Sequence, residues 1–189
     1  TFPDLTTKEI EEMTNSLLMS TATIALNEDG NPYSPRKQGA GLASLTKATT
    51  TSAYIEVEGS VKPKLELGDD VNRTGVYDME FIIKNVSDKE LKYTMDIEAM
   101  TESVSLTDET FVSERSYMLD KSNLVVKVGN SVLSDKVVTV PANGNTKVTV
   151  TLTLSSEDKA YITKSFAYGM YVEGFVKAIA NSETEVSLN

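Results

Sequence analysis

The chain has 189 residues, contains no cysteine and no histidine, and carries a net charge of −10 from 28 acidic and 18 basic residues. The missing cysteine excludes a disulfide framework and thiol catalysis, and the missing histidine removes the commonest general base and metal ligand. An acidic surface without a basic cluster predicts no nucleic-acid partner, and the apolar runs are too short to predict membrane insertion.

Residues 4–22 are predicted to form an amphipathic helix. Thr6 and Glu9 fit a capping box, in which a hydroxyl and a carboxylate each satisfy an orphan backbone donor. Ile10, Met13 and Leu17 then recur at helical spacing. Because an isolated helix of this length is marginal in water, we expect it to dock on the rest of the chain, bind another copy or fray.

A turn-rich stretch follows at residues 27–35. Asn27, Asp29 and Asn31 have the spacing of a calcium loop, but the late bidentate glutamate is missing, so an Asx-type turn is the better interpretation. The run Gln38–Gly41 lacks the spacing and the lysine of a phosphate-binding loop. Its small residues instead predict a close approach between two backbone segments.

From Ala53 the hydrophobic period changes to two, which is typical of strands with one buried face. The alternation in 76–85 and 91–100, with a turn between, predicts a hairpin. The chain is therefore predicted to be mainly β: an antiparallel immunoglobulin- or fibronectin type III-like β-sandwich, preceded by an N-terminal α-helix and an extended segment. A short helical turn is predicted at 156–159, capped by Ser155 or Ser156. The predicted strands lie near residues 53–58, 63–67, 76–85, 91–100, 111–118, 124–128, 146–155 and 168–179.

The remaining candidate sites are weak. We assign no catalytic, cofactor-binding or metal-ligating residue; the alternative left open is a calcium ion on Glu66, Asp69 and Asp70, which a solvated turn explains as well. Asn72 and Asn85 begin glycosylation sequons that also suit turns. Gly174 marks a bulge or a close contact. Core packing is preferred over a protein-binding surface for most of three aromatic side chains, Tyr168, Tyr171 and Phe175.

Several segments resemble a known family. Three of them are similar to the C-terminal end of a subtilisin-like serine protease domain, above all in large cell-envelope subtilases of the lactocepin type: Phe2–Thr6, Leu17–Ala22 and Asp29–Gly41. Two more are similar to the closing strands of the fibronectin type III-like domain that follows it in that family: Val137–Leu154 and Tyr168–Phe175.

The resemblance implies that residues 1–50 are the C-terminal remnant of a catalytic domain and residues 51–189 the sandwich. Subtilisin-type triads run Asp, His, Ser along the chain, so a segment lying after the serine contains none of them. We therefore expect a non-catalytic accessory fragment of a secreted protease, extracellular or cell-wall associated. Its expected partners are the rest of the protease domain, against which Ile10, Met13 and Leu17 would pack, and protein substrates. The alternative is a cell-surface spacer or adhesion module; a freestanding enzyme is disfavoured.

Overall fold

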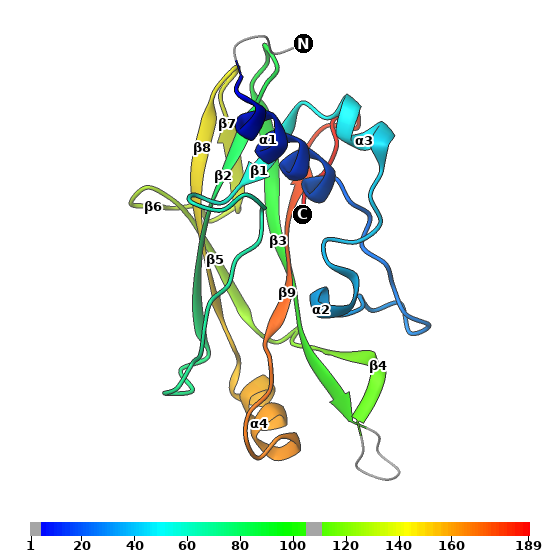
Figure 1. Ribbon diagram of the computed structural model, residues 1–189. Helices are drawn as coiled ribbons and strands as arrows, with labels where there is room; N and C mark the ends of the chain where they lie inside the picture. The colour runs from blue at the N-terminus through cyan, green and yellow to red at the C-terminus, as the bar shows by residue number, and fades with distance from the viewer. Residues whose placement is uncertain (1–4, 105–110) are drawn as a thin grey trace.

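The computed structural model describes residues 5–104 and 111–189, with only the backbone of 111–114, and shows two antiparallel sheets facing each other (Figure 1). The first sheet has the strand order β1-β2-β8-β5-β6. Its members are β1 (Ala53–Glu56), β2 (Val76–Asn85), β8 (Asn145–Thr153), β5 (Asn123–Val128) and β6 (Ser131–Val132).

The second sheet is built around β3 (Leu91–Val104), which uses both of its edges. One edge pairs with β9 (Glu173–Ala180), and the other pairs first with β7 (Val137–Val140) and then with β4 (Phe111–Met118). The sandwich class predicted from the sequence is confirmed.

The core lies between the sheets and follows the alternation seen in the sequence. In β8, Val148, Val150 and Leu152 are buried, while the threonines between them reach the outer face. The facing sheet contributes Tyr93 and Met95, which are almost completely buried. Each such side chain contributes roughly 1.5–3 kcal/mol by leaving water, which is why a period of two predicts the inward face of a strand well.

The predicted hairpin between residues 76–85 and 91–100 is wrong, because β2 and β3 belong to different sheets. Both edges of β2 are already paired, with β1 and β8, so no edge is left for β3. After Asn85 the chain crosses from the first sheet to the second, and the buried side chain of Asn85 stabilises this crossing. Its Nδ2 donates to the carbonyls of Lys89 (2.7 Å), Pro141 (3.0 Å) and Val140 (3.3 Å). Its Oδ1 accepts from the backbone N–H of Ser87 at 2.9 Å.

Two further strand predictions differ from the structure. Residues 63–67 are irregular instead of forming a strand; Pro63 lacks a backbone donor, and the segment lies between Gly59 and Gly68, both at positive φ. The last strand begins at Glu173, not at 168, because the chain turns at Gly169 with a φ of 90°. The short strand β7 was not among the predicted strands.

The described residues also form four helices: α1 (Thr7–Ser20), α2 (Pro35–Gln38), α3 (Leu45–Thr50) and α4 (Ser156–Ser165). The capping box of α1 is confirmed, since the Thr6 N–H donates to Glu9 Oε2 at 2.7 Å and the Glu9 N–H to Thr6 Oγ1 at 3.3 Å. Ser155 caps α4, accepting from the Asp158 N–H at 3.0 Å. Asp4, the predicted first helical residue, lies outside the described residues. Within them, every helix is too short or too polar to span a membrane.

Replacing Asn85 with alanine is expected to destabilise the fold by about 2 kcal/mol or more, because carbonyls at the crossing lose their donor and a cavity opens. Urea unfolding followed by circular dichroism measures this loss. Asn130→Ala is the matched control, since Asn130 is exposed in a turn. Equal losses in the two variants would contradict the role given to Asn85.

Candidate functional site: the contact between the N-terminal segment and the sandwich

The N-terminal segment, defined as residues 5–50, lies against the sandwich beside β9 (Figure 1). Helix α1 docks on β1 through two small buried residues, Ser16 and Ser20. The buried N–H of Ile55 donates to Ser20 Oγ at 2.9 Å, and the N–H of Asn189 donates to the Ser20 carbonyl at 2.8 Å. Of the three outcomes expected for this helix, docking on the sandwich is the one observed.

The face of α1 that docks overlaps the predicted apolar stripe but is rotated from it toward Ser16 and Ser20. Ile10 remains 45% exposed, and Met13 and Leu17 are only half-buried. Serine takes the buried positions because a small side chain lets the helix backbone approach the strand closely. The apolar stripe of the helix is therefore left partly uncovered in this chain.

Two local predictions for the loop after α1 are confirmed. Asn27 Oδ1 accepts from the backbone N–H groups of Asp29 (2.9 Å) and Asn31 (3.0 Å), which is an Asx-type turn. Gly41 has a φ of 110° and pairs so closely with the preceding chain that a Cβ there would collide with the carbonyl of Thr23. The predicted close backbone approach is thus made at Gly41, whereas a Cβ on Gly39 would meet nothing within 4 Å.

Arg36, at the first turn of α2, makes the main polar contact with the sandwich. Its Nε lies 3.0 and 3.1 Å from the two carboxylate oxygens of Glu173, and its Nη2 donates to Glu173 at 2.8 Å and to Glu102 at 2.7 Å. The guanidinium carbon lies 4.3 Å from the centre of the Tyr171 ring. We call these four residues, Arg36, Glu102, Tyr171 and Glu173, the Arg36 clamp.

The clamp shields two carboxylates that would otherwise lie unpaired against the sandwich. The side chains of Glu173 and Glu102 are only 12% and 13% exposed. Ser34 Oγ adds a further donor to Glu173 at 2.8 Å. The hydrogen bonds that Arg36 donates to Glu173 are the main cause that raises the pKa of Arg36 above its ordinary value. A planar guanidinium bonded to both oxygens of one carboxylate fixes orientation as well as distance.

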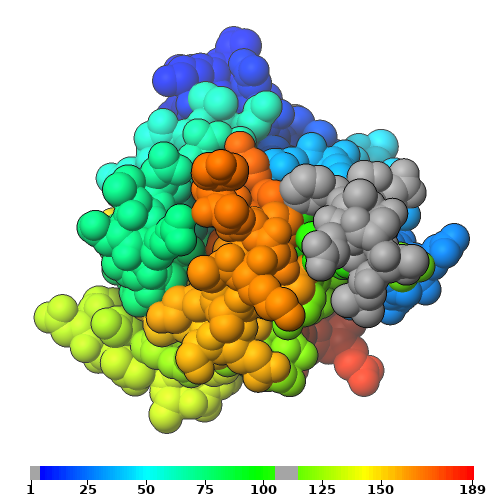
Figure 2. Space-filling view, turned by 90° about the horizontal axis from the view of Figure 1, so that it is seen from below, coloured from blue at the N-terminus to red at the C-terminus, as the bar shows by residue number. Residues whose placement is uncertain are grey.

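The three aromatic residues singled out in the sequence have different roles. Phe175 is buried, as core packing predicts, but this interpretation is wrong for the other two. Tyr171 is 62% exposed and forms the aromatic part of the clamp. Tyr168 is fully exposed in the loop that follows α4. Helix α4 and the loop after it, coloured orange, lie near the centre of the face seen in Figure 2.

A groove of about 790 Å³ opens along the side of the sandwich. We call it the lateral groove. Apolar side chains from both sheets and from the irregular segment before β2 form most of its wall, and three clamp residues, Arg36, Tyr171 and Glu173, also line it. Representative lining residues are Ile55, Val57, Leu65, Phe81, Val176 and Asn189.

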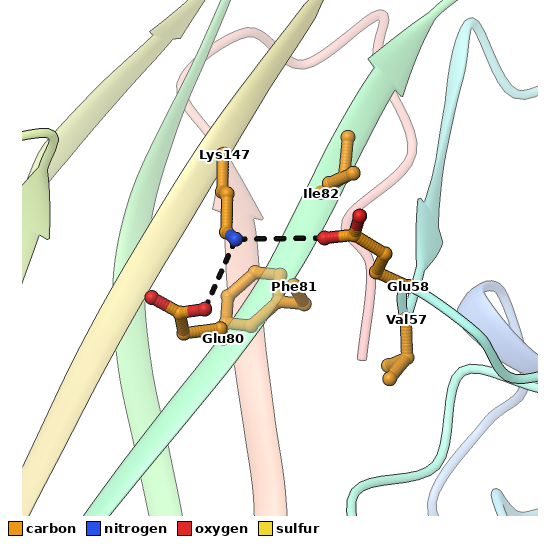
Figure 3. A pocket seen from close by; sticks show the side chains of 6 residues that line it. All are labelled: Val57, Glu58, Glu80, Phe81, Ile82 and Lys147. Atoms are coloured by element: carbon orange, nitrogen blue, oxygen red, sulfur yellow. Dashed lines mark ion pairs between the residues drawn. The ribbon is translucent and has the colours of Figure 1, made fainter.

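A second, shallower hollow of about 310 Å³ lies on the outer face of the first sheet (Figure 3). There Lys147 sits between Glu80 at 3.0 Å and Glu58 at 3.5 Å. All three side chains are at least half exposed, so water screens these pairs and they contribute little to stability. This hollow has the character of an ordinary solvated sheet face.

The acidic residues at the turn before β2 are not gathered around a common point. Asp70 accepts from the N–H groups of Gly75 (2.7 Å) and Thr74 (2.8 Å), and Glu66 pairs with Lys64. Among residues 5–104 and 111–189, no group of three or more carboxylate, imidazole or thiol side chains could hold a metal ion. Of the two sequon asparagines, Asn72 lies in the same turn, whereas Asn85 has its amide nitrogen engaged in the core.

Arg36→Ala is expected to lower the free energy of unfolding by about 2 kcal/mol, because Glu173 and Glu102 would lose a charged donor in a poorly solvated site. Lys147→Ala, which also removes a cation shared by two carboxylates, is expected to cost less than about 1 kcal/mol because that site is exposed. Urea unfolding compares the two variants. A loss for Arg36→Ala no larger than that for Lys147→Ala would refute the clamp.

The Asp70 turn predicts a pH dependence of stability. Hydrogen bonds from Gly75 and Thr74 hold the pKa of Asp70 below its ordinary value. Its stabilisation is therefore complete above the unfolded-state pKa of about 4 and is lost as the pH falls through the lower folded-state pKa. Asp70→Asn is expected to be less stable than the native protein at pH 7, with the difference shrinking in acid. Thermal unfolding at pH 7 and pH 3 tests this, with Asp69→Asn as the control; a difference that is constant with pH would contradict it.

Comparison with known proteins agrees with the fold and with the resemblance seen in the sequence. A family model described as an Fn3-like domain matches residues 65–188. Similar curated proteins are C5a peptidases of Streptococcus pyogenes, 29% identical in serotypes M6 and M18 and 28% identical in serotype M1, each over 179 residues. The predicted resemblance to a subtilisin-like protease with a following fibronectin type III-like domain is thereby confirmed.

These alignments cover 93% of the chain but only 13% of the M6 protein and 14% of the M18 and M1 proteins. The chain thus spans about one seventh of the length of the curated relatives it matches. The Fn3-like match extends from the segment before β2 to Leu188, next to the end of the chain, and so takes in nearly all of both sheets. The chain belongs to the Fn3-like domain family.

Proposed function

We propose that this chain is a non-catalytic accessory module of a secreted, cell-surface subtilisin-like serine endopeptidase. In this proposal residues 1–50 are the C-terminal end of the catalytic domain, and residues 51–189 form the sandwich that follows. The Arg36 clamp is the observation that carries the proposal. It fastens the segment most specific to the protease resemblance, Ser34–Gly41, onto two strands of the sandwich.

Exposed leucines of the N-terminal segment support a further partner on the protease side. Leu42 and Leu45 are 74% and 73% exposed, and Leu26 is 55% exposed. Apolar side chains gathered on one segment are typical of a surface that another element covers. The remainder of the catalytic domain is the partner we propose, because these leucines belong to the segment that resembles it.

The module would act on the protease by position and not by chemistry. A subtilisin-like enzyme cleaves peptide bonds through attack by its serine, with a histidine as the base and an oxyanion hole for the intermediate. This sequence has no histidine, so the base has to come from elsewhere in the protein. The sandwich is joined to the N-terminal segment through Arg36, and we propose that it shapes the access of protein substrates to the cleft.

An adhesion module is the second candidate, and the fully exposed Tyr168 is the observation that favours it. Exposed tyrosines are frequent at protein-binding surfaces. In that case the sandwich would bind a partner through the loop after α4, and proteolysis would be independent of the clamp.

The full-length protein tests the proposal. We expect the chain of residues 1–189 alone to hydrolyse no peptide substrate, while Arg36→Ala in the full-length enzyme lowers kcat/KM for a protein substrate by about tenfold or more, because a shifted sandwich misplaces the substrate. Lys147→Ala is the control and should leave kcat/KM unchanged. An Arg36→Ala enzyme with native kcat/KM, or hydrolysis by the isolated chain that a serine-directed inhibitor abolishes, would overturn it.

A further inference from the structure

The outer edge of β9 is only partly paired. Residues at even positions in this strand direct their backbone groups away from β3: Ala178 exchanges two 2.8 Å hydrogen bonds with Leu188, and the Ala180 N–H donates to Ser187 Oγ at 3.0 Å. Gly174 and Val176 are the next two even positions. Among the described residues nothing pairs with their outward N–H and C=O groups.

The lateral groove runs beside this unpaired edge. Val176 of β9 lines one side of the groove. Ile55 and Phe81 of the opposite sheet line the other side, together with Val57, which directly follows β1. At about 790 Å³ the groove has room for several side chains, and its walls are mainly apolar. An unpaired strand edge next to an apolar groove is the arrangement that accepts an added strand, since one part satisfies the backbone and the other takes alternate side chains.

The last residues of the chain already enter this arrangement. Leu188 directs its backbone to Ala178 and its side chain into the core, where it is 2% exposed. Asn189 does the opposite: its N–H binds the Ser20 carbonyl at 2.8 Å, and its side chain binds the Ala40 carbonyl at 3.3 Å. Strand alternation then directs the next residue back to β9 opposite Val176, and the third residue after Asn189 opposite Gly174.

We propose that the lateral groove receives the stretch of polypeptide that follows Asn189 in the longer protein, as a strand antiparallel to β9. The proposal rests on the proposed function only in taking the chain to be part of a longer protein. It requires apolar side chains at the first and third positions after Asn189, because these face the groove. The second position faces α1 and the N-terminal segment and has no such requirement.

This occupant is favoured over a separate peptide by two observations. The direction and register are already set by the pairing of Leu188 with Ala178, so each further pair extends an existing ladder. A covalently connected strand also has a high effective concentration at the edge, which a free peptide lacks. Covering the edge would in addition remove a flat site at which two copies of the sandwich could pair.

The test compares residues 1–189 with the same protein extended by its own next residues, about eight of them to match a typical strand. Amide hydrogen exchange is followed by NMR at Gly174 and Val176. Both amides are expected to exchange at least about tenfold more slowly in the extended protein, because they become hydrogen-bonded. Unchanged exchange at both amides, or polar residues at the first and third positions after Asn189, would overturn the proposal.

Two sets of variants separate pairing from general stabilisation. In the extended protein, serine at the first and third positions is expected to restore fast exchange, whereas serine at the second position leaves it slow. Val176→Pro removes the outward donor while keeping the bonds of β9 to β3, and should abolish the gain in Tm that the extension produces. If Val176→Pro does not fold, the comparison between the two kinds of serine variant still tests the proposal. None of these measurements depends on proteolysis, so the test of the added strand is independent of whether the longer protein is an active protease.

Discussion

Two carboxylates on neighbouring strands, Glu102 on β3 and Glu173 on β9, impose the main constraint on this molecule. They are poorly solvated, and in a chain with a net charge of −10 they need a cation that is held in place. Arg36 meets that need from outside the sandwich. The short helix α2 is thereby fixed against β9. Helix α1 is held separately, through Ser20, which accepts from Ile55 and Asn189.

The N-terminal segment and the sandwich therefore form one packed unit. The residue types agree with this interpretation. A lysine could neutralise Glu173 but could not bond to both of its oxygens, reach Glu102 and lie over Tyr171 at once. Most other ion pairs among the described residues, such as those of Lys147, are exposed. Water screens these pairs, so they do little to fix the geometry of the fold.

The sequence predicts features whose partners are close along the chain. The capping box at Thr6, the Asx turn at Asn27 and the cap at Ser155 are all completed within four residues. Alternation identifies the buried face of a strand, but it does not say which strand lies beside it, so it predicts a hairpin where the chain in fact passes from one sheet to the other after Asn85. The clamp was missed for the same reason. Arg36 lies 66 and 137 residues from its two carboxylate partners, and no local pattern connects them.

The contact between Ser20 and Asn189 has a mechanical consequence. It joins the last turn of α1 directly to Asn189, so two residues far apart in the sequence lie side by side, and the C-terminus lies next to the end of α1 (Figure 1). A pulling force applied between these two residues would load this short contact first, and tension would reach the strands between them only once the contact had opened.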